Sequence, residues 1–261
     1  MSRRHLRRAA GLAGLLVLTF AGGTVAQNTN TAQGNAGRDA HGARMLVHHA
    51  LDMAIEGSTL QLTSRELVAN DAAGADRKGS DVSERVRDLQ RDARQNFEGT
   101  NKMLADAYAI VRDDQANAMS RRYYDAAARY TKTLYGVIGE PLAKSEDFGA
   151  GTDKDKGKAL TAADVATVIL VNHAVKEAID AYHLRKMTAH AADGTATERL
   201  REHAKQMAAH SQRCIDKLSG SAGAKDRDDV PSVARLARQA RDLVQMVEDD
   251  RDDNTPGEGR R

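Results

Sequence analysis

The chain has 261 residues, with 39 Lys and Arg against 37 Asp and Glu, six Tyr, three Phe, three Pro, no Trp and one Cys. A single cysteine excludes an intramolecular disulfide, and the near balance of charge gives no argument for nucleic-acid binding. Good helix formers fill the long segments, and few runs alternate apolar with polar residues, so the sequence predicts an all-α fold.

Residues 1–26 have the features of a secretory signal peptide. The segment starts with basic residues, continues with an apolar run and ends in small residues at Ala26. We expect cleavage near Ala26 and an exported protein, either periplasmic or secreted. The adjacent Arg3 and Arg4 also resemble a twin-arginine export signal, so that route stays open. The apolar run is too short for a comfortable membrane span, and we expect no integral membrane segment after cleavage.

Removal of this segment changes the sign of the net charge. Residues 1–26 contain four arginines and no acidic residue, which leaves 35 basic and 37 acidic residues in the mature chain. The basic character of the whole chain therefore belongs to the part that is removed. We expect no nucleic-acid partner, while a protein partner or a second copy of the chain stays open.

Breaker-rich segments divide the rest of the chain. Residues 27–40 are expected to be a disordered lead-in, residues 139–160 a linker and residues 250–261 a disordered tail. Two helical regions remain, residues 41–138 and residues 161–249. Within them we expect helices at 41–69, 82–112, 115–138, 161–190, 196–218 and 231–249.

The two helical regions resemble each other in sequence. "LVHHALDMAIEGSTL" (46–60) and "LVNHAVKEAIDAYHL" (170–184) are identical at seven of fifteen positions, at an offset of 124. In the next helices "ERVRD" (84–88) matches "ERLRE" (198–202) at an offset of 114, and a weaker match joins the third helices. The pattern predicts an internal duplication of a three-helix unit.

One such unit has too few apolar faces to bury itself well. We therefore expect two helical hairpins, packed face to face as a four-helix bundle, with one extra helix per repeat as a cover or arm. Ile55 and Ile179 occupy matching positions of the two repeats and are predicted to be buried.

This arrangement resembles the ferritin-like superfamily, whose bundles are built from two related helix pairs. The resemblance covers about residues 41 to 220 and extends to secreted or periplasmic bacterial helical families of that type. It would imply a di-metal centre with a Glu-x-x-His motif in each half. That motif is absent, because Asn101 stands three residues after Glu98, and Ile215 stands three after Gln212. Ferroxidase or oxygenase chemistry is therefore not expected.

Matching helix faces of the two repeats nevertheless carry histidine and carboxylate residues. His49 and Glu56 lie seven residues apart on one face, and His173 and Asp180 repeat the pair. A third stripe, within residues 200–214, contains two more histidines at core spacing. Imidazole and carboxylate together suit zinc, iron or copper, so such a site would hold a transition metal. The predicted metal ligands are His49, Glu56, His173, Asp180, His203 and His210.

A purely structural role is the alternative for the same side chains. A histidine on an apolar helix face is usually a hydrogen-bonded core or boundary residue, and methionines such as Met53 are usually core filler. Cys214 would add a soft ligand that favours copper(I). His48 and its counterpart Asn172 are expected at polar edge positions, and His183 on a solvated face. Both readings of the histidines stay open at this point.

Motifs of the common enzyme classes are missing. The sequence has no Gly-rich phosphate loop, no Gly-x-Ser-x-Gly and no His-Glu-x-x-His. We therefore expect an exported helical-bundle protein that acts as a non-catalytic binding or structural module. The alternative is a metal-binding bundle that stores, buffers or exchanges electrons through iron, copper or zinc.

Overall fold

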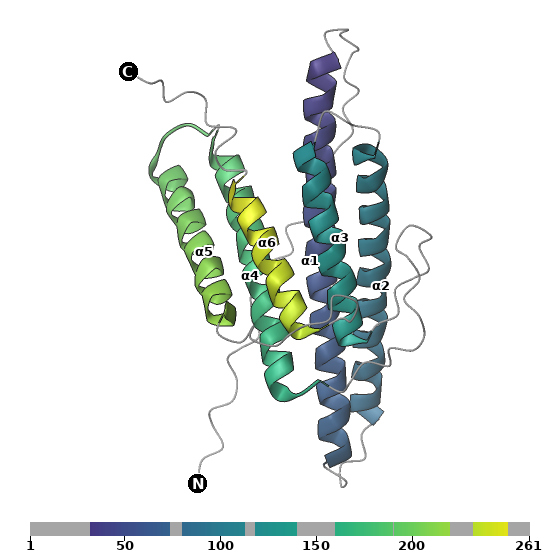
Figure 1. Ribbon diagram of the computed structural model, residues 1–261. Coiled ribbons are helices and arrows are strands. Elements are labelled where there is room, and N and C mark those ends of the chain that lie inside the picture. Colours follow the sequence, from purple (N-terminus) through teal and green to yellow (C-terminus); the bar gives the residue numbers. More distant parts are fainter. Residues whose placement is uncertain are drawn as a thin grey trace.

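The computed structural model describes residues 32–73, 80–112, 118–139, 160–189, 191–219 and 232–249. These residues form six α-helices and contain no strand, which confirms the all-α prediction (Figure 1). The expected signal peptide and tail, and nearly all of the expected linker, lie outside them. The helices are α1 (Ala32–Ala73), α2 (Ser80–Val111), α3 (Ala118–Ile138), α4 (Ala162–Ala189), α5 (Thr195–Ser219) and α6 (Val233–Asp249).

Helix boundaries follow local chemistry. α4 begins at a reciprocal cap, in which the Thr161 amide donates to Asp164 Oδ2 (2.9 Å) and the Asp164 amide donates to Thr161 Oγ1 (3.2 Å). α3 ends at Gly139, whose φ of +70° is left-handed backbone that glycine adopts without a steric penalty. α1 begins at Ala32, so residues 32–40 of the expected disordered lead-in are helical. Gly34, Asn35, Gly37 and Asp39 in that stretch are poor helix formers, so the extension continues the helix that follows and does not come from local propensity.

Four helices form the centre of the molecule, and they are not the four expected. α1 packs against α2 and α3, and α4 packs against α5 and α6. The two halves meet where α1 contacts α4 and α3 contacts α6. α1, α3, α4 and α6 therefore surround the core, while α2 and α5 flank it on opposite sides (Figure 1). The expected packing of the α1–α2 hairpin directly on the α4–α5 hairpin is wrong for the described residues.

The side chains of α3 and α6 explain the central place of these helices. α3 buries four tyrosines, and α6 buries a stripe that includes Leu236, Leu243 and Val247. Such bulky apolar surface is stabilised most where it is covered on several sides. α5 presents a narrower buried stripe with smaller side chains, among them Ala204 and Ser211. Contacts with α4, and fewer contacts with α6, are enough to bury this stripe.

Matching positions of α1 and α4 are buried alike. Ile55 and Ile179 are 6% and 0% exposed, which confirms that both are buried. His48 and Asn172 are 1% and 3% exposed, so their expected edge positions are wrong. Both are covered because α1 and α4 cross at the centre, where side chains from the neighbouring helices close over them. Among the described residues, no helix is both long and apolar enough to cross a membrane.

Candidate metal site on helices α4 and α5

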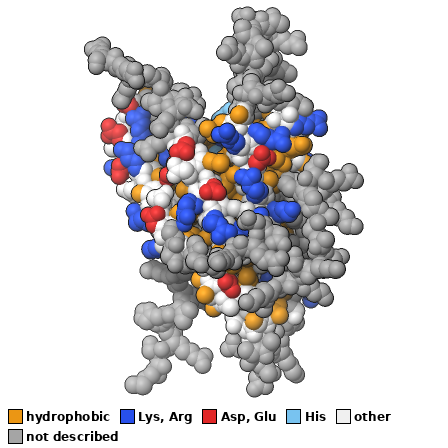
Figure 2. Space-filling model, in the orientation of Figure 1, with side chains coloured by type: hydrophobic (Ala, Val, Ile, Leu, Met, Phe, Trp, Pro, Cys, Tyr) orange, Lys and Arg blue, Asp and Glu red, His pale blue; other side chains and the backbone are white. Residues whose placement is uncertain are grey.

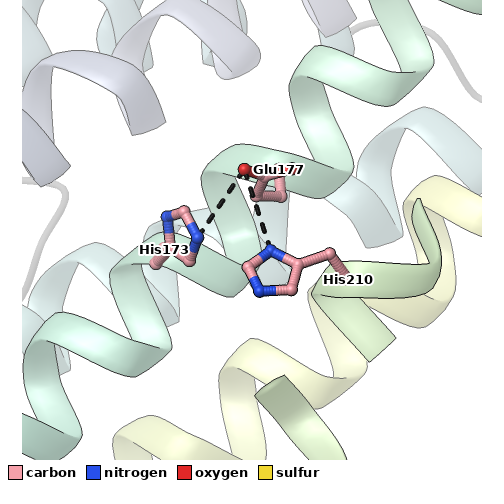
Figure 3. A group of neighbouring side chains, drawn as sticks. All are labelled: His173, Glu177 and His210. Carbon is pink, nitrogen blue, oxygen red and sulfur yellow. Dashed lines mark ion pairs between the residues drawn. The ribbon is translucent and has the colours of Figure 1, made fainter. Parts of the chain in front are cut away.

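His173, Glu177 and His210 bring three potential metal ligands together. One ligand atom of each residue lies within 4.8 Å of the other two. Glu177 Oε1 is 3.6 Å from His173 Nε2 and 3.9 Å from His210 Nδ1, so one carboxylate oxygen faces both imidazoles (Figure 3). The two rings meet edge to face with centroids 5.0 Å apart. Among the residues that the structure describes, this is the one such group of three.

Backbone geometry places these side chains. His173 and Glu177 are four residues apart on α4, the spacing at which helical side chains are neighbours. α5 is fixed alongside by Ser211, whose fully buried hydroxyl donates to the Ala174 carbonyl at 2.7 Å. The bond joins the residue after His210 to the residue after His173. It therefore sets the position of α5 against α4 where the three ligands meet.

The site lies at the surface. The His173 and His210 side chains are 45% and 44% exposed, and the Glu177 side chain is 20% exposed. Imidazole and carboxylate ligands bind zinc at about 2.0–2.2 Å. Ligand atoms of one ion therefore lie within about 4 Å of each other. Side chains with this exposure can close the remaining gap by small rotations, and water would fill the open positions of a bound ion.

Cys214 lies beneath this site. Its Sγ is 3.9 Å from His210 Nε2, the nitrogen that does not face Glu177. The thiol is 3% exposed, and burial raises its pKa, as does the Glu177 carboxylate, although Lys217 and Arg213 act in the opposite direction. A protonated thiol is a weak metal ligand, so Cys214 is better placed to support the His210 ring than to bind an ion.

Only two of the six predicted ligands belong to this group. His49, Glu56 and His203 are exposed, and Asp180 pairs with Lys176 at 3.3 Å. A site in the bundle interior would need His49 and His173 to point inward, but both are exposed. Residues seven apart share a helix face but lie roughly 10 Å apart along the axis. That spacing is too long for one ion to join His173 with Asp180, or His203 with His210.

The first half of the molecule has a related arrangement without the ligands. At the α1–α2 contact, Met53 meets Gly99, where an added side chain would lie 2.0 Å from the Met53 methyl carbon. Met53 aligns with Glu177, so Gly99 takes the place that His210 has in the second half. Matching Gly99 with His210 corresponds to an offset of 111 between α2 and α5, about one helical turn from the 114 of the sequence match. The counterparts of the triad are His49, Met53 and Gly99.

Sequence reasoning missed Glu177 and a second histidine pair. The signal for Glu177 was its four-residue spacing from His173. His48 Nδ1 lies 3.2 Å from His183 Nε2, and the His48 ring also makes edge contacts with Tyr123 and Tyr182. His183 is half-buried rather than on a solvated face. The spacing of residues within one helix cannot predict the His48–His183 contact, because His48 belongs to α1 and His183 to α4.

The chain was compared with protein-family models, curated proteins and solved structures. The chain matches no family model, no curated protein and no solved structure.

Proposed function

We propose that this protein is an exported, non-catalytic helical module that binds one divalent transition-metal ion through His173, Glu177 and His210. The observation that carries the proposal is the convergence of these three ligand atoms within 4.8 Å from two helices. A pair of imidazoles with one carboxylate suits zinc, copper(II), nickel or iron better than magnesium or calcium. The buried Ser211 bond supports a preformed spacing between the helices.

Exposure of the site favours binding and exchange over catalysis. Metal-assisted catalysis depends on a dry, shaped cavity around the open coordination position. Here nearly half of each histidine side chain is open to solvent. We therefore assign the site to metal buffering or delivery. Export rests on the features of residues 1–26.

The same proposal includes the origin of the fold. We infer that the two halves arose by duplication of a three-helix unit, with a four-helix centre formed by α1, α3, α4 and α6. The α1–α4 crossing supports this inference, because contacts recur at matching positions. His48 contacts Tyr182, and Asn172, the counterpart of His48, donates to Ser58, the counterpart of Tyr182, at 2.8 Å.

Metal titration of matched variants tests the site. We expect the untagged protein to bind one equivalent of Zn²⁺ in isothermal titration calorimetry. His173→Ala should weaken binding by more than about tenfold, since one of three ligands is lost. Glu177→Gln, which keeps the side-chain shape, should weaken it similarly.

His49→Ala is the matched control. It removes an exposed histidine at the matching position of α1, where Met53 stands in place of the carboxylate. Zinc affinity should therefore stay unchanged. An unmodified protein that binds no zinc, or a His49→Ala variant as weak as His173→Ala, would refute the metal site and leave a structural role for the triad.

A further inference from the structure

A small cavity lies between the four central helices, away from the metal triad of α4 and α5. Its volume is about 10 Å³, enough for about one water molecule or one metal ion. Figure 2 shows hydrophobic side chains, with histidine surface beside them, near the upper ends of α3 and α6. Metal sites of helical bundles are built from side chains of facing helices, as this cavity is. The residues that line it, from α1, α3, α4 and α6, are Arg44, His48, Met119, Tyr123, Tyr182, Met246 and Val247.

His48 brings a neutral imidazole to the lining. Its side chain is 1% exposed, and burial above all lowers its pKa to about 3. Its Nδ1 atom lies 3.2 Å from His183 Nε2, whereas the described residues offer His48 Nε2 no hydrogen-bond partner. When Nδ1 donates its hydrogen to His183, Nε2 is the unprotonated nitrogen that can bind a metal ion. A hydrogen bond from the other ring nitrogen is the usual support of a metal-binding histidine.

Two methionine thioethers border the same cavity. Met119 of α3 is 44% exposed, and Met246 of α6 is half-buried. Methionine is often a flexible filler of cores, but the exposure of Met119 does not fit that role. Thioether sulfur is a soft ligand that selects copper(I) over hard cations. Because these side chains are unbranched, small rotations can bring both sulfur atoms to one ion.

The charge of the lining restricts the ion further. Arg44 is the one charged residue among the seven, and its guanidinium carbon lies 6.0 Å from the centroid of the Tyr123 ring. None of the seven is acidic, so no carboxylate in the lining offsets the charge of a bound cation. Repulsion by Arg44 is proportional to the charge of the ion, so a monovalent ion is disfavoured half as much as a divalent one.

Aromatic rings close the cavity around His48. The buried rings of Tyr123 and Tyr182 contact His48 edge to face, with centroids 5.5 and 4.9 Å away. The cavity therefore has no room for the several water ligands that a hard ion such as magnesium keeps. We propose that this cavity is a second metal site, which binds copper(I) through His48 Nε2 and the sulfur atoms of Met119 and Met246.

Competitive titration against bicinchoninate, under anaerobic conditions with ascorbate, measures copper(I) binding. The protein is the full chain with His173→Ala and His210→Ala, so the result does not depend on the zinc triad. We expect one equivalent of copper(I) to bind, and Zn²⁺ should not displace it. Met119→Leu and Met246→Leu conserve side-chain volume, and each should weaken copper(I) binding by about tenfold or more, since one of three ligands is lost.

Met187→Leu is the matched control, because Met187 of α4 is 70% exposed and does not line the cavity. It should leave the affinity for copper(I) within about twofold. Copper(I) is diamagnetic, so the imidazole ¹⁵N signals of His48 should shift at one equivalent in a protein that keeps His48. Absence of copper(I) binding, an equal loss in Met187→Leu, unchanged affinity in both cavity variants or unmoved His48 signals would overturn the proposal.

Discussion

His48 shows how a single side chain depends on several helices. It is 1% exposed, and it shares a hydrogen bond with His183. One N–H hydrogen between the two neutral rings satisfies both nitrogens, whereas protonation of His48 would place a positive charge where water cannot solvate it. Burial first, then His183, Arg44 and His41, lower the pKa of His48 to about 3. The residue therefore stays neutral in the folded protein over the whole physiological range.

This neutral histidine predicts sensitivity to acid. The pKa of His48 falls from 6.5 in the unfolded chain to about 3 in the folded one. As the pH falls, the unfolded chain takes up this proton before the folded protein does. The contribution of neutral His48 to the free energy of unfolding is therefore complete above about pH 6.5 and is lost progressively as the pH falls from 6.5 toward 3. Between pH 7.5 and 5.0 the loss attributable to His48 is about 2 kcal/mol.

Denaturant unfolding at the two pH values measures this loss. His48→Asn introduces the residue that stands at the matching position 172, and it removes the titrating ring. The variant should be less stable at pH 7.5 because it packs less well, but it should lose less free energy of unfolding on acidification than the unmodified protein. Equal losses in the two proteins would show that His48 is not the source.

At the same residue scale, local spacing predicted part of the site and not the rest. His173 and His210 were predicted because they are histidines on helix faces, and Glu177 could have been predicted because it lies four residues after His173. The burial of His48 could not be predicted in this way, because it depends on Tyr123 of α3 and Tyr182 of α4. Periodicity assigns a residue to a face of its own helix and says nothing about what covers that face.

Comparison of the two hairpins leads to a prediction at the scale of elements. α1 and α2 bring His49, Met53 and Gly99 to positions that match the triad of α4 and α5. Met53→Glu combined with Gly99→His should therefore create a second metal site, and zinc stoichiometry should rise from one to two. A Cβ added at position 99 meets only the sulfur and the methyl carbon of Met53, and Met53→Glu replaces both of these atoms. Replacing a helical glycine should also favour the helix.

The same two substitutions in a His49→Ala background provide the control, and that protein should bind one zinc ion. Circular dichroism establishes that each variant keeps its helices. A folded double variant that still binds a single ion would show that the two hairpins are not equivalent. It would also argue against the offset of 111 between α2 and α5.

For the molecule as a whole, the sequence predicted the helices and their order but not which of them form the centre. Apolar spacing was enough to place Ile55 and Ile179 in the core. The central role of α3 had a signal in composition, since residues 118–138 contain four of the six tyrosines. Such large side chains are buried only in a deep core, and α3 would not have one if it were an extra helix on the outside of the bundle. Which helices pack together depends on how well two helix surfaces fit each other, and the apolar spacing of one helix contains no information about the surface of another.

Side-chain NMR of the histidines tests the central claim, the metal triad, most directly. Zn²⁺ is added to ¹⁵N-labelled protein, and the imidazole signals are assigned with single His→Gln variants. The signals of His173 and His210 should change together and reach their end point at one equivalent, while those of His49 and His203 stay in place. Unchanged His173 and His210 signals, or equal changes at His49 and His203, would contradict a metal site at His173, Glu177 and His210.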